Sequence, residues 1–279
     1  MPVVLITGCS SGFGKLAAIE FARRGDTVYA SMRDPGKGGA LQAEAKDAGV
    51  SVQALALDVN DRASVEAAVA EVVRRGGRID VLVNNAGIGT HGPIEDFEDE
   101  EIAAIFETNL MGAVRAARAV APHMRAQRSG TIVNVTSLAG KVTAPFGGVY
   151  SASKHALESI SDALYYELHP FGVRVVVVEP GGFETEFGNN VRPARRFTEG
   201  SAYVELERRF AEATTRLPGG GERAPAQTVA NVIVDAAKSD EPKRRYLVGQ
   251  DAELIGGLHK SMSDEDFEKA MRTTLDFWD

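Results

Sequence analysis

The sequence of 279 residues has little cysteine and histidine and no long apolar run. It contains one cysteine, Cys9, and five histidines that are scattered along the chain. A single cysteine cannot form an intrachain disulfide, which fits a reducing compartment, and no His/Cys cluster has the spacing of a zinc site. We therefore predict no metal site. No stretch of about 18 apolar residues is present, so we also predict no membrane-spanning helix.

The sequence also lacks a basic surplus. Its 31 Lys and Arg residues are outnumbered by 39 Asp and Glu residues, which gives a formal net charge of −8. Nucleic acid is therefore not an expected partner, because phosphate neutralisation requires a basic surface. The first residues run into a glycine-rich turn without a basic and then apolar leader, which is typical of a cytoplasmic protein.

Short apolar runs alternate with longer, charge-rich stretches of helical periodicity. The runs are 3–6, 27–31, 52–57, 79–83, 131–135 and 173–178, with a further one at 245–248. Such alternation is typical of βαβ units. We therefore predict an α/β fold, a single Rossmann-type doubly wound parallel sheet of about seven strands with helices on both faces. No linker divides the chain, so residues 1–279 are expected to form one dinucleotide-binding and catalytic domain.

The stretch from 182 to about 224 departs from this pattern. It ends in three successive glycines, 219–221. Its aromatic residues stand among many charges and are Phe183, Phe187, Phe197, Tyr203 and Phe210. We interpret the stretch as a substrate-loop insertion that covers a pocket as a mobile lid. The alternative is a surface helical hairpin with ordinary core aromatics.

A glycine-rich turn follows the first predicted strand and precedes a helix. Gly8 permits a tight turn, Gly12 lets main-chain N–H groups approach a pyrophosphate, and Gly14 allows close packing of helix on strand. The helix N-terminus adds the positive end of its dipole. This context predicts a dinucleotide site. The residues of the turn assigned to it are Gly8, Ser10, Ser11, Gly12, Phe13 and Gly14.

The end of the second predicted strand bears on the choice of dinucleotide. An acid there would bind the ribose 2′-hydroxyl of NAD, whereas a basic residue accommodates the 2′-phosphate of NADP. Ser31 stands where the acid would be expected, and Arg33 follows two residues later. NADP(H) is therefore favoured over NAD(H). The alternatives are that Asp34 binds the ribose, or that Arg33 is a solvated loop charge.

Tyr150 and Lys154 are four residues apart, which places both side chains on one face of a helix. A phenol with a pKa near 10 is a poor base at neutral pH. A neighbouring ammonium and a positively charged oxidised nicotinamide both favour the phenolate. Tyr150 can then act as general acid in reduction and as general base in oxidation.

These residues carry a resemblance to a known family. The run Tyr150-Ser-Ala-Ser-Lys154, Ser137 upstream of it, Asn109 and the glycine-rich turn resemble the compact branch of the short-chain dehydrogenase/reductase family. The resemblance covers roughly residues 3–190. It includes Asp58, the run Asn84-Asn85-Ala86-Gly87, Pro180-Gly181 and Thr185.

The resemblance implies roles for these positions. Ser137, in preference to its neighbour Thr136, would orient the substrate oxygen, and Lys154 would also hold the nicotinamide ribose. Asn109 would anchor a water relay to Lys154, although it can also be read as a structural amide in a kinked helix. The remaining cofactor contacts would be Asp58 and Val59 at the adenine, Asn85, Ala86 and Gly87 near the adenosine ribose, Pro180 and Gly181, and Thr185 at the carboxamide.

The predicted function is NADP(H)-dependent hydride transfer between nicotinamide and a secondary alcohol, ketone or aldehyde. The expected pocket is apolar, so a bulky substrate is favoured, and it comprises Val142, Phe146, Val149, Phe183 and Phe187. Motifs outside that pocket resemble the 17β-hydroxysteroid and retinol dehydrogenase subgroup. The alternatives are an NAD-dependent enzyme of the same family and a non-catalytic dinucleotide sensor. The resemblance also implies a homodimer or homotetramer through the helices at 100–127 and 150–169.

Overall fold

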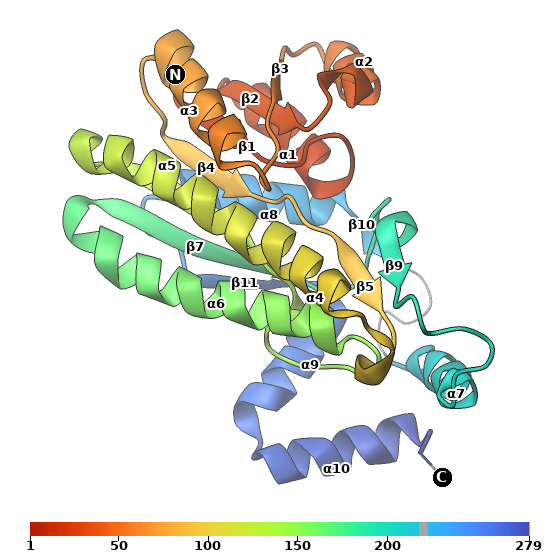
Figure 1. The fold of residues 1–279 in the computed structure, drawn as a ribbon. Coiled ribbons are helices and arrows are strands. Elements are labelled where there is room, and N and C mark those ends of the chain that lie inside the picture. Colours follow the sequence, from red (N-terminus) through yellow and green to blue (C-terminus); the bar gives the residue numbers. More distant parts are fainter. Residues whose placement is uncertain (218–222, 279) are drawn as a thin grey trace.

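The computed structural model describes residues 1–217 and 223–278 (Figure 1). Its centre is a sheet of seven parallel strands in the order β11-β7-β6-β4-β1-β2-β3. The strands are β1 (Val3–Ile6), β2 (Thr27–Met32), β3 (Gln53–Ala56), β4 (Val81–Asn84), β6 (Gly130–Val135), β7 (Val173–Pro180) and β11 (Arg245–Val248). The order reverses between β1 and β4, which is the switch point where such sheets bind ligands. The predicted doubly wound fold is confirmed.

Helices cover both faces of this sheet (Figure 1). Successive side chains of a strand point to opposite faces, so Val4 and Ile6 lie in one apolar cluster whereas Val3 and Leu5 lie in another. The first cluster is completed by α1, α2 and α8, and the second by α3, α5 and α6. The helices are α1 (Gly12–Arg23), α2 (Gly39–Asp47), α3 (Arg62–Gly76), α4 (Asp99–Phe106), α5 (Gly112–Gln127), α6 (Gly148–Leu168), α7 (Val204–Thr214), α8 (Gln227–Lys238), α9 (Gln250–Ser261) and α10 (Asp264–Leu275).

Local sequence explains where several of these elements begin and end. The carboxylate of Asp61 accepts a hydrogen bond of 2.9 Å from the Ala63 N–H at the start of α3, and Gly77 ends that helix with φ of 74°. Between α4 and α5 the chain forms a π-helical turn, Glu107–Met111. Such turns are rare and often occur at functional sites. No helix in the described part of the chain has both the length and the apolarity needed to cross a membrane.

The segment from 182 onward is attached to the body by two short strand pairings. Strand β8 (Phe183–Glu184) pairs with β10 (Ala224–Pro225), and β9 (Val191–Pro193) pairs with β5 (Gly89–His91). The segment then forms α7 rather than a helical hairpin. Phe210 of α7 packs with Phe146 and the C-terminal Phe277 in an apolar cluster. Some of the aromatic residues therefore belong to the core, while the glycines 219–221 lie outside the described residues.

Candidate active site

One cavity lies at the carboxyl ends of the central strands. Its volume is about 1350 Å³, whereas pockets for drug-sized ligands usually measure about 300–1,000 Å³. The cavity therefore has room for a dinucleotide together with a substrate. Its walls come from the loops after β1, β2, β3, β4, β6 and β7 and from the segment around residues 180–192.

The glycine-rich turn is held open toward this cavity. Gly8 has φ of 73°, and a Cβ there would lie 2.8 Å from the Cα of Ala86, so a side chain has no room. A Cβ on Gly14 would lie 2.4 Å from Asn85 Nδ2, which explains the close approach of helix α1. The Asn85 amide donates to the carbonyl oxygens of Thr7 and Gly8, both at 2.9 Å. The Asn85 side chain therefore holds the glycine-rich turn in place from the loop after β4.

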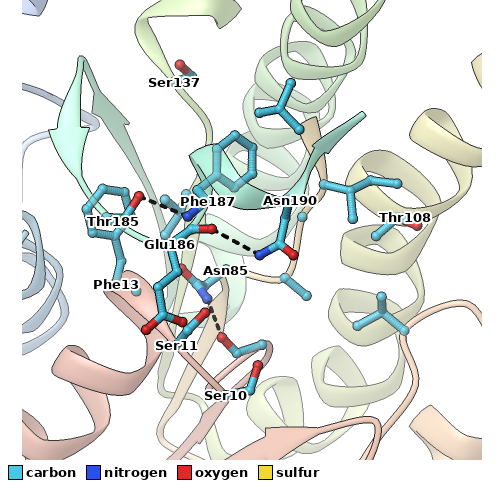
Figure 2. A pocket seen from close by; sticks show the side chains of 18 of the residues that line it. Ser10, Ser11, Phe13, Asn85, Thr108, Ser137, Thr185, Glu186, Phe187 and Asn190 are labelled. Carbon is cyan, nitrogen blue, oxygen red and sulfur yellow. Dashed lines mark hydrogen bonds between the residues drawn. The ribbon is translucent and has the colours of Figure 1, made fainter. Parts of the chain in front are cut away.

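The start of α1 has free main-chain donors. Ser11 precedes the helix, but its side chain makes no capping hydrogen bond. The first N–H groups of a helix have no partner within the helix, and together with the helix dipole they bind anions. Ser10, Ser11, Gly12 and Phe13 all line the cavity here (Figure 2). The residues present therefore fit the pyrophosphate of a dinucleotide.

The loop after β2 requires one correction. Ser31 is fully buried, its hydroxyl donates to the Ile6 carbonyl at 2.9 Å, and it does not line the cavity. It was predicted as a cofactor contact, but its hydroxyl is already used between two strands. Arg33 does line the cavity, and so does Lys37, which the sequence reading missed. Lys37 comes close because residues Pro35–Gly38 form a short 3₁₀ helix.

Asp34, the alternative ribose ligand, also lines the cavity. One of its carboxylate oxygens, Oδ1, accepts a hydrogen bond of 2.9 Å from the Gly36 N–H and caps the 3₁₀ helix. By contrast, Arg33 and Lys37 form no ion pair with any residue in the described ranges. Two cations without an ion-pair partner are therefore available at this end of the cavity, next to the carboxylates of Asp34 and Asp58.

The adenosine end of the cavity contains the other residues that the resemblance assigned to it. Asp58, Val59, Asn85, Ala86 and Gly87 line the wall. Asp58 Oδ1 accepts a 3.0 Å hydrogen bond from the Asn60 N–H, which shapes the turn after β3. At the other end, Pro180, Gly181 and Thr185 also line the cavity, and the Thr185 hydroxyl accepts a 3.3 Å bond from the Phe187 N–H (Figure 2).

Ser137, Tyr150 and Lys154 meet on one wall of the cavity. The Ser137 hydroxyl lies next to the Tyr150 phenol. Two main-chain groups orient the Ser137 hydroxyl. It accepts a hydrogen bond from the Ala139 N–H at 3.1 Å, and it lies 3.3 Å from the Pro180 carbonyl. The Lys154 ammonium donates to the Val135 carbonyl at 3.0 Å and lies 5.7 Å from the centre of the Tyr150 ring.

Burial shifts the pKa values of both the Tyr150 phenol and the Lys154 ammonium. It raises the pKa of Tyr150 to about 12, and the neighbouring Ser137 hydroxyl opposes the shift. It lowers the pKa of Lys154 to about 8, and the negative charge of Glu158 opposes that shift. At neutral pH the phenol therefore holds its proton and the lysine is still mostly an ammonium.

Asn109 lies in the π-helical turn and is buried. Its Oδ1 accepts from the Ile88 N–H at 2.8 Å, while its Nδ2 donates to the Ile88 carbonyl at 3.0 Å and to the Ser153 hydroxyl at 3.1 Å. Ser153 in turn donates to the Tyr150 carbonyl at 2.7 Å. The Asn109 side chain therefore connects the loop after β4 to the helix that carries Tyr150. Its role in a water relay stays a prediction.

The predicted substrate pocket is only partly formed by the residues assigned to it. Phe183 and Phe187 line the cavity, and the ring centre of Phe187 lies 5.9 Å from that of Tyr150. Val142, Phe146 and Val149 do not line it. Phe146 packs instead on Phe210, 5.8 Å between ring centres, and Val149 is buried in a separate apolar cluster. Phe146 is turned away by packing against α7 and the C-terminal residues, and Val149 by packing against Phe97, Ile105 and Ala194. No local pattern in the sequence revealed either contact.

Other cavity residues were missed because long-range pairing brings them there. Arg192 reaches the wall through the β5–β9 pairing, and Arg223 through the β8–β10 pairing. Thr108 and Glu186 also line the cavity. In Figure 2 the Glu186 carboxylate points toward Ser11, and its carbonyl accepts a 3.1 Å hydrogen bond from Asn190.

Comparisons with known proteins agree with this geometry. A family model for short chain dehydrogenase matches residues 2–196. A 3-ketodihydrosphingosine reductase of Bacteroides thetaiotaomicron is 42% identical over 188 residues, 67% of this chain and 66% of that protein. Human 17-beta-hydroxysteroid dehydrogenase type 1 is 35% identical over 252 residues, 88% of this chain and 76% of that protein.

A solved structure extends the similarity to nearly the whole chain. The crystal structure of a short-chain dehydrogenase from Streptomyces avermitilis matches with a TM-score of 0.81 and 34% identity, covering 98% of this chain and 100% of that chain. The chain therefore belongs to the short-chain dehydrogenase/reductase family, whose members are oxidoreductases acting on CH–OH and C=O groups.

Proposed function

We propose that the protein is an NADP(H)-dependent oxidoreductase that transfers hydride between nicotinamide and a bulky, apolar ketone, aldehyde or secondary alcohol. The observation that carries this proposal is the convergence of Ser137, Tyr150 and Lys154 on the wall of a cavity that also contains an uncapped helix N-terminus. A phenol and an uncapped helix N-terminus thus face one space, which supports a proton donor and a pyrophosphate site side by side.

The cofactor would supply or accept the hydride when bound, and the protein would supply position and the proton. In reduction, the Ser137 hydroxyl and the Tyr150 phenol both donate hydrogen bonds to the carbonyl oxygen and orient it. The phenol then gives its proton to the oxygen as negative charge develops there. The Lys154 ammonium stabilises the resulting phenolate, since it lies near the ring. In oxidation the same groups act in reverse.

The preference for NADP(H) rests on charge in the loop after β2. Arg33 and Lys37 both line the cavity and have no acidic partner among the described residues. A 2′-phosphate would gain charge-assisted hydrogen bonds from them. A 2′-hydroxyl would need an acceptor, and one of the two oxygens of the nearby Asp34 carboxylate already caps the 3₁₀ helix. This arrangement favours NADP(H) over NAD(H).

The substrate class rests on the aromatic residues beside Tyr150. Phe187 lies against the Tyr150 ring, and Phe183 packs edge-on against Phe13 at 5.9 Å between ring centres. A carbonyl group placed at Tyr150 would therefore have an apolar neighbour. The names of two relatives, a ketodihydrosphingosine reductase and a hydroxysteroid dehydrogenase, are consistent with a large apolar substrate.

The test is a panel of ketones and aldehydes of increasing apolar size, assayed with NADPH and with NADH by the loss of absorbance of the reduced cofactor. We expect turnover with NADPH and a kcat/KM that rises with apolar size. Equal kcat/KM for the two cofactors would refute the cofactor preference. No turnover with any member of the panel, by a protein that binds NADPH, would favour a dinucleotide sensor.

A further inference from the structure

A buried cluster of charged side chains lies behind the catalytic wall. It comprises Glu158 of α6, Glu179 at the end of β7, Lys141 in the loop after β6 and Arg245 of β11. Only 4% of Glu158 and 2% of Glu179 is exposed to solvent. Burial of an ionised carboxylate is costly unless it is paired, so this arrangement requires an explanation.

Glu158 is the better-paired of the two carboxylates. Its Oε1 accepts a 2.6 Å hydrogen bond from the Thr136 hydroxyl, and its Oε2 lies 2.8 Å from Lys141 Nζ and 2.9 Å from Arg245 Nε. Three donors therefore bind this one carboxylate.

Glu179 is held less tightly. Its Oε1 lies 3.5 Å from Lys141 Nζ and 3.4 Å from Arg245 Nε, and it accepts no hydrogen bond from the described residues. Burial, together with the charge of Glu158, raises the pKa of Glu179 to about 7. Near neutral pH Glu179 is therefore only partly ionised.

Members of the cluster, or the residues bonded to them, are close in sequence to Lys154 and Ser137 of the catalytic wall. Glu158 is four residues after Lys154, on the same face of α6, and its charge raises the pKa of that lysine against the effect of burial. Thr136 directly precedes Ser137. Glu179 directly precedes Pro180, whose carbonyl accepts from the Ser137 hydroxyl.

We propose that Glu158 is a positioning residue whose carboxylate, fixed by Thr136, Lys141 and Arg245, keeps the Lys154 side chain in its ammonium form at neutral pH. The proposal rests on the proposed function, which requires that ammonium to stabilise the Tyr150 phenolate. Burial alone would favour the neutral amine of Lys154. The other charged groups near Glu158 are Glu179, which faces the same two cations, and Asp162, which pairs with Arg245 at 2.8 Å.

The substitution Glu158→Gln tests this role, because it removes the charge but retains an acceptor for Thr136. The readout is the pH dependence of Lys154 acetylation by acetic anhydride, quantified by peptide mass spectrometry. Only the neutral amine reacts, so the midpoint reports the pKa of Lys154, which is about 8 in the native protein. We expect Glu158→Gln to lower the midpoint by about one pH unit or more, and Glu158→Asp to restore most of it. An unchanged midpoint would overturn the proposal.

Asp162→Asn provides a matched control. Asp162 is also on α6 and also binds Arg245, but it is eight residues from Lys154 and more exposed. We expect its substitution to leave the Lys154 midpoint in place. A shift as large as that of Glu158→Gln would mean that anchoring of Arg245, not the charge of Glu158, controls the lysine, and the proposal would be wrong.

Lys141→Gln tests the proposal even if Glu158→Gln does not fold. Lys141 lies in a loop and its side chain is 31% exposed. Its removal leaves the Glu158 charge less compensated, so the Lys154 midpoint should rise. A lower or unchanged midpoint would contradict the proposal.

The alkaline limb of kcat/KM for ketone reduction should move in the same direction as the acetylation midpoint in each variant. Acetylation needs neither substrate nor turnover. If no carbonyl compound is reduced, the proposed function fails while the midpoints still decide the role of Glu158. If reduction is observed but the midpoints do not move, only the role of Glu158 fails.

Discussion

The two sides of the cavity are built in different ways. On the cofactor side, the loops follow strands of the central sheet, and Asn85 ties the glycine-rich turn to the loop after β4. On the substrate side, the segment from 182 onward is joined by strand pairings of two and three residues and by the packing of its side chains on Phe146 and Phe97. The cofactor side is therefore determined by the sheet itself, whereas the substrate side depends on contacts added outside the sheet and can vary without disturbing the fold.

The largest effect on kcat is expected at Tyr150, where the cofactor side and the substrate side of the cavity meet. Tyr150→Phe removes the phenolic proton but leaves the ring against Phe187. Loss of a general acid typically lowers the rate by about 10²- to 10⁴-fold, so we expect kcat to fall by that factor while NADPH binding persists. The matched control is Tyr166→Phe on the same helix, whose side chain is 66% exposed. Near-normal kcat in Tyr150→Phe would show that another group donates the proton.

The next prediction distinguishes Phe146 from Phe187, both of which the sequence predicts in the substrate pocket. Phe146→Ala empties a buried position between Phe210 and Phe197, so we expect it to lower the free energy of unfolding by about 3 kcal/mol. Phe187→Ala should instead raise KM for bulky ketones with a smaller change in stability, because Phe187 lines the cavity. Urea unfolding and steady-state kinetics on both variants distinguish the roles. The reverse pattern would place Phe146 at the substrate.

The central sheet was predictable because each of its strands is signalled locally. The apolar runs of the seven strands and the cap at Asp61 require only short stretches of sequence. The errors arose where a distant segment decides the outcome. Ser31 has the sequence position expected for a ribose contact, but its hydroxyl donates a hydrogen bond to the Ile6 carbonyl of the neighbouring strand. Phe146 lies in a loop near Tyr150, but α7 provides a larger apolar surface on another side.

The candidate site likewise contains residues that local sequence predicts and residues that only long-range contacts bring to the cavity. Ser137, Tyr150 and Lys154 were identified from spacing and resemblance, and the structure brings them to one wall. Arg192 and Arg223 could not be identified, since they reach the cavity through pairings between strands that are far apart in sequence. Lys37 had a weaker signal, a basic residue after the Pro35-Gly36 turn. A basic residue close to Arg33 in such a turn would have been a reasonable second candidate.

On the cofactor side, Arg33→Ala should weaken NADPH binding without a comparable effect on NADH. Loss of one hydrogen bond to a charged group corresponds to about tenfold or more in affinity, so KM for NADPH should rise by that factor. Lys37→Ala should act in the same direction. Arg62→Ala is a suitable control, since that side chain is 72% exposed and pairs with Glu66 on α3. Equal increases of KM for both cofactors would place Arg33 away from the 2′-phosphate.

The smallest effect concerns the place where the substrate side approaches the cofactor side. The Glu186 carboxylate points toward Ser11 at the start of α1, where the pyrophosphate would bind (Figure 2). Because its negative charge repels phosphate through solvent, Glu186→Gln should tighten NADPH binding by about two- to fivefold, and added salt should reduce the difference. Glu184→Gln is the matched control, since Glu184 is also exposed but does not line the cavity. Isothermal titration calorimetry at two salt concentrations measures both variants. Weaker binding by Glu186→Gln would mean that the carboxylate supports the cofactor site, and that the segment from 182 onward is a functional part of the cofactor side.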